Sequence, residues 1–514
     1  MCLQRSFGPD RLIQLILDDH GEVIEWQLAL DVPNGTPYCT LSHCWGSQQP
    51  TRLLKSNLAR FQLASPIKSL PKTFQDASIV TCSLGLQYIW IDSLCIIQDD
   101  PQDWRIQSVQ MGSVYQSAAC NIAATWASGG SDGCFSTRSL DVLELPVLTL
   151  NDRPESTMSY KIANLSRHDW DITEAPLNKR GWVVQERYLA NRQLSFTKLQ
   201  VYWECQELVA SEQWPSGEMN LELMAKPTLQ AGHRADMREN WNKLVATYSS
   251  CQLTYQSDKL PAISGMVRAL QDITGDVCVG GLWKNDLAYQ LCWKHDVHPD
   301  NTGRTTTAGR AAPTWSWANF RGPVAPDEKY PRYTTGTPYV AENPTEGEAC
   351  RAQQKLTVKG MVLLGQAEAA NNVNGLSLPT VYGLSIGLQE VKSGHGLEIS
   401  WDEHISSAEI NPERWPEFTA ERSAKLLFLI VWYEDPEIDR EEAHGLVLRK
   451  VPTADSEHTL HVRMGAFELQ STAKSLLCEM LTERLGPRLN RNVDEWVMLS
   501  DARLADLVQI VTIV

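Results

Sequence analysis

Polar side chains follow an apolar stretch of this chain abruptly at residues 92–95. The sequence Tyr-Ile-Trp-Ile at 88–91 has the composition of a buried strand, and Asp92, Ser93 and Cys95 come directly after it. Buried parallel strands carry functional groups at their carboxyl ends, so we expect a site here. A buried carboxylate must be paired or hydrogen-bonded, which makes Asp92 the first candidate for proton transfer. Its expected partners are Ser93, His43 and either Arg180 or Arg187.

His43 follows another predicted strand, within Thr-Leu-Ser-His-Cys-Trp-Gly at 40–46. An imidazole titrates near neutrality, so His43 can serve as a general acid or base or bind a ligand. The alternative, a half-buried histidine that fastens a turn, stays open. For Cys44 and Cys95, packing is a better explanation than nucleophilic chemistry. The His and Cys residues do not form a complete ligand set at zinc spacing, so we expect no metal.

A second polar and aromatic cluster lies at residues 180–187. If residues 182–189 are helical, Trp182, Gln185 and Glu186 share one face and Arg187 projects from an adjoining one. Two interpretations remain open: an ion pair that anchors the helix, or a clamp whose arginine fork binds phosphate or carboxylate. If the predicted site is catalytic, we expect Asp92 or Glu186 to transfer a proton and Arg187 to orient an anionic or carbonyl oxygen. The candidate catalytic residues are Asp92, Glu186, His43 and Arg187.

The elements that must position these residues alternate between strand and helix. Strands are predicted at 38–42, 88–92 and 118–124, and helices at 73–84 and 103–116. Phe74, Ala77 and Val80 recur at helical spacing, and Gly85 supplies a stop. Asp103 is expected to cap the second helix. This alternation predicts an α/β fold with a parallel sheet and flanking helices.

Three domains are predicted along the chain. Residues 1–215 form the first, with a motif core at 38–205 that ends in a hairpin at 193–205. Residues 216–345 are expected to be mainly helical, with linkers and a strand at 313–318 on which Trp315 and Trp317 face one side. Residues 346–514 read as β-rich, with strands at 355–365, 425–433, 445–451 and 459–469.

Composition narrows the class of protein. The chain has 514 residues and a formal charge of −16, which argues against nucleic-acid partners and anionic membrane surfaces. Its 13 cysteines are scattered without a CxxC pair, as expected of reduced thiols inside the cell. The first residues lack the features of a signal peptide, and the longest apolar run, 426–433, is too short for a membrane helix. We therefore expect a soluble, cytoplasmic protein.

Five ordered motifs between residues 38 and 187 resemble those of the fungal heterokaryon-incompatibility (HET) domain. They are Tyr-Cys-Thr-Leu-Ser-His-Cys-Trp-Gly at 38–46, Leu-Pro-Lys-Thr-Phe-Gln-Asp-Ala at 70–77, the run at 90–100, Asp-Trp at 103–104 with Met-Gly and Val-Tyr at 111–115, and Arg-Gly-Trp at 180–182 with Gln-Glu-Arg at 185–187. Weaker similarity continues at 258–265, 281–283 and 313–318. The resemblance implies a role in fungal self/non-self recognition and cell death.

HET domains are distantly similar to Toll/interleukin-receptor (TIR) domains, which implies a TIR-like parallel sheet. Some TIR domains cleave NAD with a glutamate on a helix. HET sequences usually carry a glutamate three residues after the tryptophan of the Asp-Trp pair, and Gln107 stands there in this chain. Gln cannot ionise, so NAD cleavage would need another carboxylate, Asp92 or Glu186. The expected ligand-binding residues are Trp45, Ser93, Cys95, Trp104, Gln107, Arg180 and Trp182.

Three functions stay open on the sequence. The first is an incompatibility or cell-death effector that acts through assembly or nucleotide chemistry, with NAD as a candidate substrate. The second is a HET-fold enzyme that cyclises or rearranges a small fungal metabolite in a pocket built from some of the 18 tryptophans. The third is a non-catalytic interaction module with an exposed apolar patch. The expected partners are a small-molecule ligand, other fungal proteins or further copies of the chain. Neither a Walker loop nor a GxGxxG fingerprint occurs, which excludes conventional nucleotide cradles.

Overall fold

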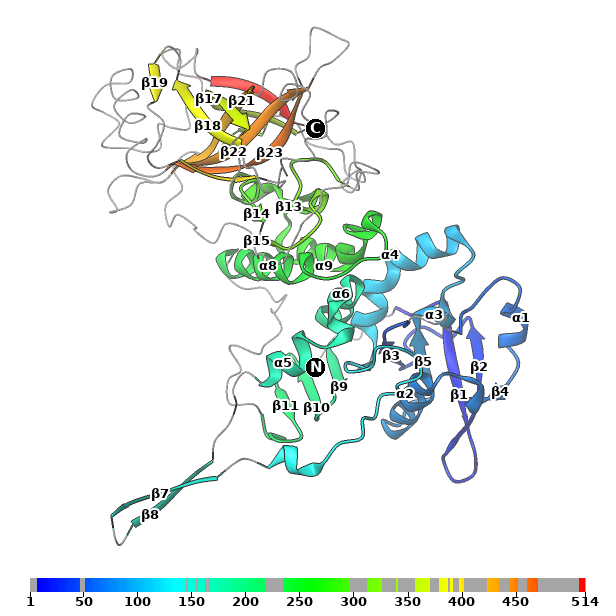
Figure 1. Ribbon diagram of the computed structural model, residues 1–514. Coiled ribbons are helices and arrows are strands. Elements are labelled where there is room, and N and C mark those ends of the chain that lie inside the picture. The colour runs from blue at the N-terminus through cyan, green and yellow to red at the C-terminus, as the bar shows by residue number, and fades with distance from the viewer. Residues whose placement is uncertain are drawn as a thin grey trace. The chain divides into compact units, whose positions relative to one another are not determined.

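The computed structural model describes residues 7–46, 51–144, 147–153, 156–161, 164, 167–217, 234–295 and 312–325, and beyond these the strands between residues 339 and 513 named below. The chain divides into two compact units (Figure 1). The first comprises Met1–Gly232, Cys251–Thr254 and Pro261–Ile273, and the second comprises His233–Ser250, Tyr255–Leu260 and Thr274–Val514.

The first unit is built on a nine-stranded mixed sheet. In spatial order its strands are β11 (Val209–Ser211), β10 (Val201–Cys205), β9 (Arg192–Phe196), β6 (Cys120–Ala123), β3 (Cys39–Ser42), β5 (Tyr88–Ile91), β1 (Arg11–Leu17), β2 (Val23–Leu30) and β4 (Ser65–Pro66). Pairing is parallel from β9 through β6 and β3 to β5, and antiparallel elsewhere. The predicted parallel sheet is therefore correct for the four central strands and wrong for the outer ones.

The antiparallel strands β1 and β2, at one side of the sheet, were not predicted, whereas the hairpin of β9 and β10 at the other side was. β1 and β2 form a hairpin that joins the sheet where Ile13 of β1 pairs with Ile89 of β5. This pairing connects segments far apart in the sequence, which local patterns do not reveal. By contrast, the expected hairpin at 193–205 is confirmed as β9 and β10, in which Val201 pairs with Phe196.

Helices lie on both faces of this sheet. They are α1 (Leu58–Phe61), α2 (Lys72–Ser83), α3 (Asp92–Cys95), α4 (Pro101–Ser117), α5 (Arg167–Thr173), α6 (Gly181–Leu189) and, almost entirely in this unit, α9 (Ser264–Thr274). Successive strand residues point to opposite faces. Cys39 hydrogen-bonds to Thr81 of α2, whereas Trp90 packs edge-on against Tyr115 of α4, with ring centroids 5.8 Å apart. Thus α2 and α4 cover opposite faces.

The N-terminal cap of α4 differs from the prediction. Asp100, not Asp103, is the N-cap residue, and its carboxylate accepts hydrogen bonds from the backbone N–H groups of Gln102 and Asp103. Asp103 lies in the first turn of α4 and forms a two-point ion pair with Arg11, at 2.6 and 2.8 Å. That pair ties the unpredicted strand β1 to α4.

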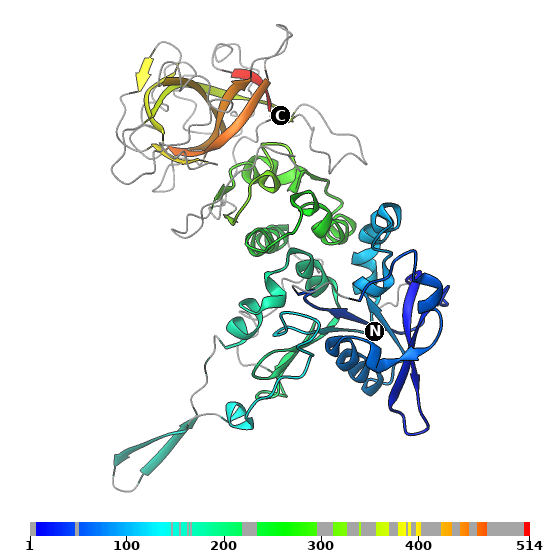
Figure 2. The ribbon, with the colours of Figure 1, turned by 45° about the vertical axis from the view of Figure 1, so that its right-hand side comes forward.

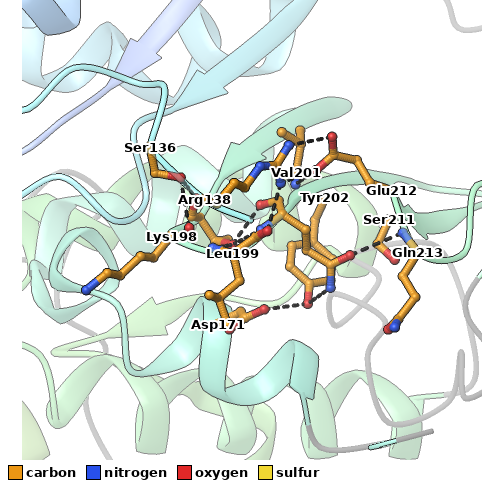
Figure 3. Close-up of polar contacts among 12 residues, drawn as sticks. Ser136, Arg138, Asp171, Lys198, Leu199, Val201, Tyr202, Ser211, Glu212 and Gln213 are labelled. Carbon is orange, nitrogen blue, oxygen red and sulfur yellow. Dashed lines mark hydrogen bonds and ion pairs between the residues drawn. The ribbon is translucent and has the colours of Figure 1, made fainter. Parts of the chain in front are cut away.

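The outer edge of the sheet, at β10 and β11, is held by a segment that follows β6 (Figure 3). Ser136 donates to the carbonyl of Lys198 at 2.8 Å, and Arg138 donates to the carbonyl of Leu199 at 2.8 Å. The guanidinium of Arg138 also pairs with Glu212, whose carboxylate accepts the backbone N–H of Val201 at 2.7 Å. A separate two-stranded hairpin comprises β7 (Val147–Arg153) and β8 (Ser156–Lys161).

The second unit contains helices followed by strands. Its helices are α8 (Arg234–Ser249) and α10 (Leu287–Gln290), and its short strands are β12 (Cys278–Val279), β13 (Leu282–Trp283), β14 (Lys294–His295) and β15 (Val324–Ala325). The strand predicted at 313–318 is wrong. Residues Trp317–Asn319 form a 3₁₀ helix, because the Ser316 hydroxyl caps the N–H of Ala318. The indole N–H of Trp317 donates to the carbonyl of Gly281 at 2.9 Å.

Beyond residue 326 all the elements that the structure describes are strands, which agrees with the β-rich character predicted for residues 346–514. They are β16 (Tyr339–Val340), β17 (Leu356–Ala369), β18 (Pro379–Ile386), β19 (Gln389–Val391), β20 (Leu397–Trp401), β21 (Ser423–Tyr433), β22 (Ala443–Val451), β23 (Leu460–Leu469) and β24 (Val508–Ile513). The order is β19-β18-β17-β21-β22-β23-β20, and β24 pairs with both β17 and β23. Figure 2 shows the longer of these strands curving around a common centre.

Candidate functional site

The candidate site lies at the carboxyl ends of two central parallel strands. His43 follows β3, and Asp92 follows β5 as the first residue of α3. The two side chains face each other, with 3.7 Å between His43 Nδ1 and Asp92 Oδ1. His43 is buried at 2% exposure, and burial lowers the pKa of its imidazole to about 4 despite the nearby Asp92 carboxylate. At neutral pH the ring is therefore uncharged.

Two further predicted residues hold the carboxylate of Asp92. The indole N–H of Trp45 donates to Asp92 Oδ2 at 2.9 Å, and the backbone N–H of Ser93 donates to Oδ1 at 2.6 Å. The Asp92 side chain keeps 20% exposure, in contrast to the closed surroundings of His43. Asp92 is thus the accessible acidic group of the site, fixed in orientation by two donors.

Glu186 reaches the same region from α6. It is 5% exposed, and burial raises the pKa of its carboxyl to about 7. The Arg180 guanidinium and hydrogen bonds with Ser42 and Tyr115 act in the opposite sense, because they favour the charged form. A carboxyl group that titrates near neutrality can both release and accept a proton at physiological pH.

Arg180 connects the strand ends to α6. It is the residue that precedes the first turn of this helix, and its guanidinium donates to the backbone carbonyl of His43. Its positive charge acts on His43, Cys44 and Glu186 alike: it opposes protonation of the imidazole and favours the thiolate and the carboxylate. Arg180 is the predicted arginine that the structure brings to the site.

Two buried polar atoms of the site have no hydrogen-bond partner among the described residues, His43 Nε2 and Ser93 Oγ. Buried polar groups are nearly always satisfied, so an unsatisfied pair needs a reason, such as a water molecule or a ligand. Both belong to residues that border Asp92. The imidazole ring itself packs edge-on against Phe74 at 4.9 Å between centroids.

Arg187 lies apart from this cluster. Its guanidinium pairs with the fully buried carboxylate of Glu204, at 2.7 Å from Nη2 to Oε1 and 3.2 Å from Nε to Oε2. The pair corresponds to the first interpretation of the cluster at 180–187, an ion pair that anchors the helix, and it occupies the guanidinium that was expected to orient a ligand oxygen. Cys95 is 1% exposed, and burial raises the pKa of its thiol to about 12. A thiol in that state is suited to packing.

The remaining predicted ligand-binding residues lie on and near α4. Trp104 and Trp182 contact each other edge-to-face, with ring centroids 6.3 Å apart, and Trp104 is 36% exposed. Gln107 is buried, and its amide donates to the carboxylate of Asp10 at 2.7 Å. The amide at position 107 therefore binds a carboxylate from the segment before β1.

Sequence reasoning missed Ser42 and Tyr115 as neighbours of Glu186. Ser42 is adjacent to His43, and its place at a strand end was a usable signal. Tyr115 lies in α4, and only the packing of that helix on the sheet brings its hydroxyl to Glu186. Among the described residues no group of three or more His, Cys, Asp or Glu side chains is arranged to hold a metal ion.

The first unit is thus a mixed α/β fold with polar side chains gathered at the carboxyl ends of its central strands. Residues 38–186 match the family model described as heterokaryon incompatibility protein (HET), so the chain carries a HET domain. The match covers β3 to α6 and includes His43, Asp92 and Glu186. Comparisons with curated proteins and with solved structures gave no match. In the part of the chain that the structure describes, no helix is long and apolar enough to cross a membrane.

Proposed function

We propose that this protein is an effector of the fungal incompatibility type, and that its HET domain acts on a small molecule by proton transfer at Glu186. The family supports the first half of the proposal, because HET domains are linked with fungal incompatibility. The observation that carries the second half is the buried carboxyl of Glu186, whose pKa is about 7 at the edge of the sheet.

The surrounding residues suit this role. Glu186 transfers the proton, and Arg180 orients an anionic or carbonyl oxygen of the ligand with its charged fork. Asp92, held by Trp45, offers an accessible acceptor for a ligand hydroxyl or amino group. The uncharged His43 and the Ser93 hydroxyl supply two further polar atoms for ligand groups. Small-molecule sites commonly combine a few such convergent polar groups with apolar walls.

NAD is the first substrate to test. In this proposal Glu186 supplies the carboxylate that Gln107 cannot. Purified protein incubated with NAD is expected to release nicotinamide, measured by chromatography. The Glu186→Gln variant should lose release, whereas Glu207→Gln, which changes an exposed glutamate of the same unit, should retain it. Equal release by native protein and Glu186→Gln would contradict the assigned role.

A second candidate function rests on Gln107. Its amide is occupied by Asp10, so the position used by other HET sequences for a carboxylate is built for a different contact here. An enzyme with a HET fold that acts on a small fungal metabolite would not need a carboxylate at position 107. If native protein releases no nicotinamide, this candidate is favoured, and extracts of fungal metabolites should be screened for depletion by native protein but not by Glu186→Gln.

A further inference from the structure

A row of buried polar side chains crosses the central sheet beneath α6. Thr40 of β3 pairs in register with Asn121 of β6, Asn121 pairs with Gln193 of β9, and Gln193 pairs with Glu204 of β10. In-register residues on neighbouring strands point to the same face. With Ser42, which lies two residues beyond Thr40, these five residues form what we call the buried polar row. Each is exposed by 2% or less.

Hydrogen bonds join the members of the row end to end. Thr40 Oγ1 lies 3.0 Å from Asn121 Oδ1, and Asn121 Nδ2 donates to Ser42 Oγ at 3.1 Å and to Gln193 Oε1 at 2.9 Å. Gln193 Nε2 then donates to Glu204 Oε2 at 3.2 Å. The row is therefore a continuous chain of polar contacts from β3 to β10.

Both ends of the row meet α6. At one end Ser42 lies beside the carboxyl of Glu186, which Arg180, Asp92 and Tyr115 also face, and at the other Glu204 forms the ion pair with Arg187. Glu186 and Arg187 are consecutive residues, so the helix that carries the proposed proton-transfer group also carries the cation at the far end of the row. Two polar contacts that look unrelated along the sequence are thus connected through the sheet.

The direction of each hydrogen bond follows from the Arg187 end. An ionised Glu204 paired with arginine only accepts, so Gln193 must present its N–H₂ to Glu204 and its oxygen to Asn121. Asn121 must then present its own N–H₂ to Gln193 and to Ser42. The Ser42 oxygen accepts from Asn121 Nδ2, and its single proton has two acceptors, Asn121 Oδ1 at 3.2 Å and the carboxylate of Glu186. Asn121 Oδ1 already accepts from Thr40, and a charged carboxylate is the stronger acceptor, so the arrangement favours donation to Glu186.

We propose that the buried polar row is a positioning network, which aims the Ser42 hydroxyl proton at Glu186 and so sets the pH at which Glu186 titrates. The inference rests on the proposed role of Glu186 and extends it to Asn121, Gln193 and the Arg187–Glu204 pair as positioning residues. Apolar side chains would fill these strand positions without the cost of burying amides and a carboxylate, so the row favours a specific arrangement of the site over maximal stability.

The test is the titration of Glu186 followed by infrared spectroscopy on the full chain. The band of the protonated carboxyl group is assigned by its loss in Glu186→Gln. Ser42→Ala removes the donor to Glu186, and Gln193→Met interrupts the row without a change of charge or a large change of volume. Each has a matched control outside the row: Ser78→Ala, whose hydroxyl bonds within α2, and Gln200→Met, which is equally buried.

The row predicts that Ser42→Ala raises the titration midpoint by roughly one pH unit and Gln193→Met by roughly half a unit, since the charged form of Glu186 loses a donor. Both controls should leave the midpoint where it is in native protein. A folded Gln193→Met variant with an unchanged midpoint would overturn the inference. So would an equal shift in Gln200→Met, because general loosening of the fold would then explain the effect.

This titration needs no substrate, so its outcome is separable from the proposed function. A shifted midpoint in Gln193→Met together with full NAD cleavage by Glu186→Gln would support the row and reject the catalytic role. An unchanged midpoint in Gln193→Met together with loss of cleavage in Glu186→Gln would reject the role of the row and support the catalytic role of Glu186.

Discussion

At the scale of single residues, the titrations of Glu186 and His43 change the stability of the protein in opposite directions as the pH rises. The pKa of Glu186 is raised to about 7, so folding favours its protonated form, and stability is lost as the pH rises from about 4.5 through 7. The pKa of His43 is lowered to about 4, so stability is lost as the pH falls from about 6.5 through 4. Between these limits the two contributions largely cancel in the native protein.

Glu186→Gln should expose the contribution of His43. The variant lacks the destabilising charge, so its free energy of unfolding relative to native protein should grow with pH, by up to about 3 kcal/mol between pH 4.5 and 7. Urea unfolding at four pH values in this interval measures the difference. A difference that is constant with pH would mean that Glu186 titrates near the value of an ordinary glutamate.

Gln107→Glu should destabilise the protein. The present amide donates to Asp10 at 2.7 Å, and a glutamate would place a second carboxylate against the first. Because Asp10 is exposed, we expect a loss of about 1 kcal/mol in the free energy of unfolding. Adding Asp10→Asn should restore the donor and most of the lost stability. Equal stability of native and Gln107→Glu protein would show that the contact between Gln107 and Asp10 contributes nothing to the free energy of unfolding.

At the scale of elements, α4 and α9 approach so closely that only glycine fits. A Cβ at Gly112 would lie 2.8 Å from the Cα of Gly265, and one at Gly265 would meet Gln185 Oε1 at the same distance. Backbone atoms cannot yield as a flexible side-chain end can, so the two helices would have to separate.

Gly112→Ala should therefore destabilise the first unit by about 1 to 3 kcal/mol, although alanine is the better helix former. Ser113→Ala, one position further along the same helix, is the control and should cost little. Thermal unfolding of both variants measures the effect. A Gly112→Ala protein as stable as the control would contradict the close approach of α4 and α9.

The same scale shows what the sequence could and could not predict. The central strands and α2, α4 and α6 were predictable, because apolar runs, helical spacing and glycine stops are local signals. The strand ends also identified Asp92 and His43. The pairing of the N-terminal hairpin with β5, the partner of Arg187 and the Asp10 contact of Gln107 depend on residues 17 to 97 positions apart, and a single sequence does not encode such pairings locally. The tryptophans at 315 and 317 alternate like a strand, yet a serine cap and indole hydrogen bonds produce a 3₁₀ turn.

At the scale of the whole molecule, titrating groups are buried in both units. In the second unit Lys259 is 4% exposed, its ammonium lies 5.4 Å from the centre of the Trp317 ring, and its Nζ donates to the carbonyl of Phe320. Burial lowers the pKa of this amine to about 7. Stability of this unit is therefore lost as the pH falls from about 10.5 through 7.

Lys259→Met should remove that dependence. Hydrogen exchange of peptides from α8 should become slower in the variant than in native protein at pH 7, and the two should converge near pH 10. Peptides from α2, in the first unit, serve as the internal control and should exchange equally in both proteins. Faster exchange of α8 in Lys259→Met at pH 7 would show that the cation contributes more through its contacts than its burial costs.

The central claim, that the chain is an incompatibility effector acting through Glu186, is tested most directly by growth. Native protein, Glu186→Gln and Glu207→Gln are induced to equal levels in a filamentous fungus, and colony growth is followed. We predict that native protein and Glu207→Gln arrest growth and that Glu186→Gln does not. Equal arrest by Glu186→Gln, or unimpaired growth with the native protein, would contradict the claim.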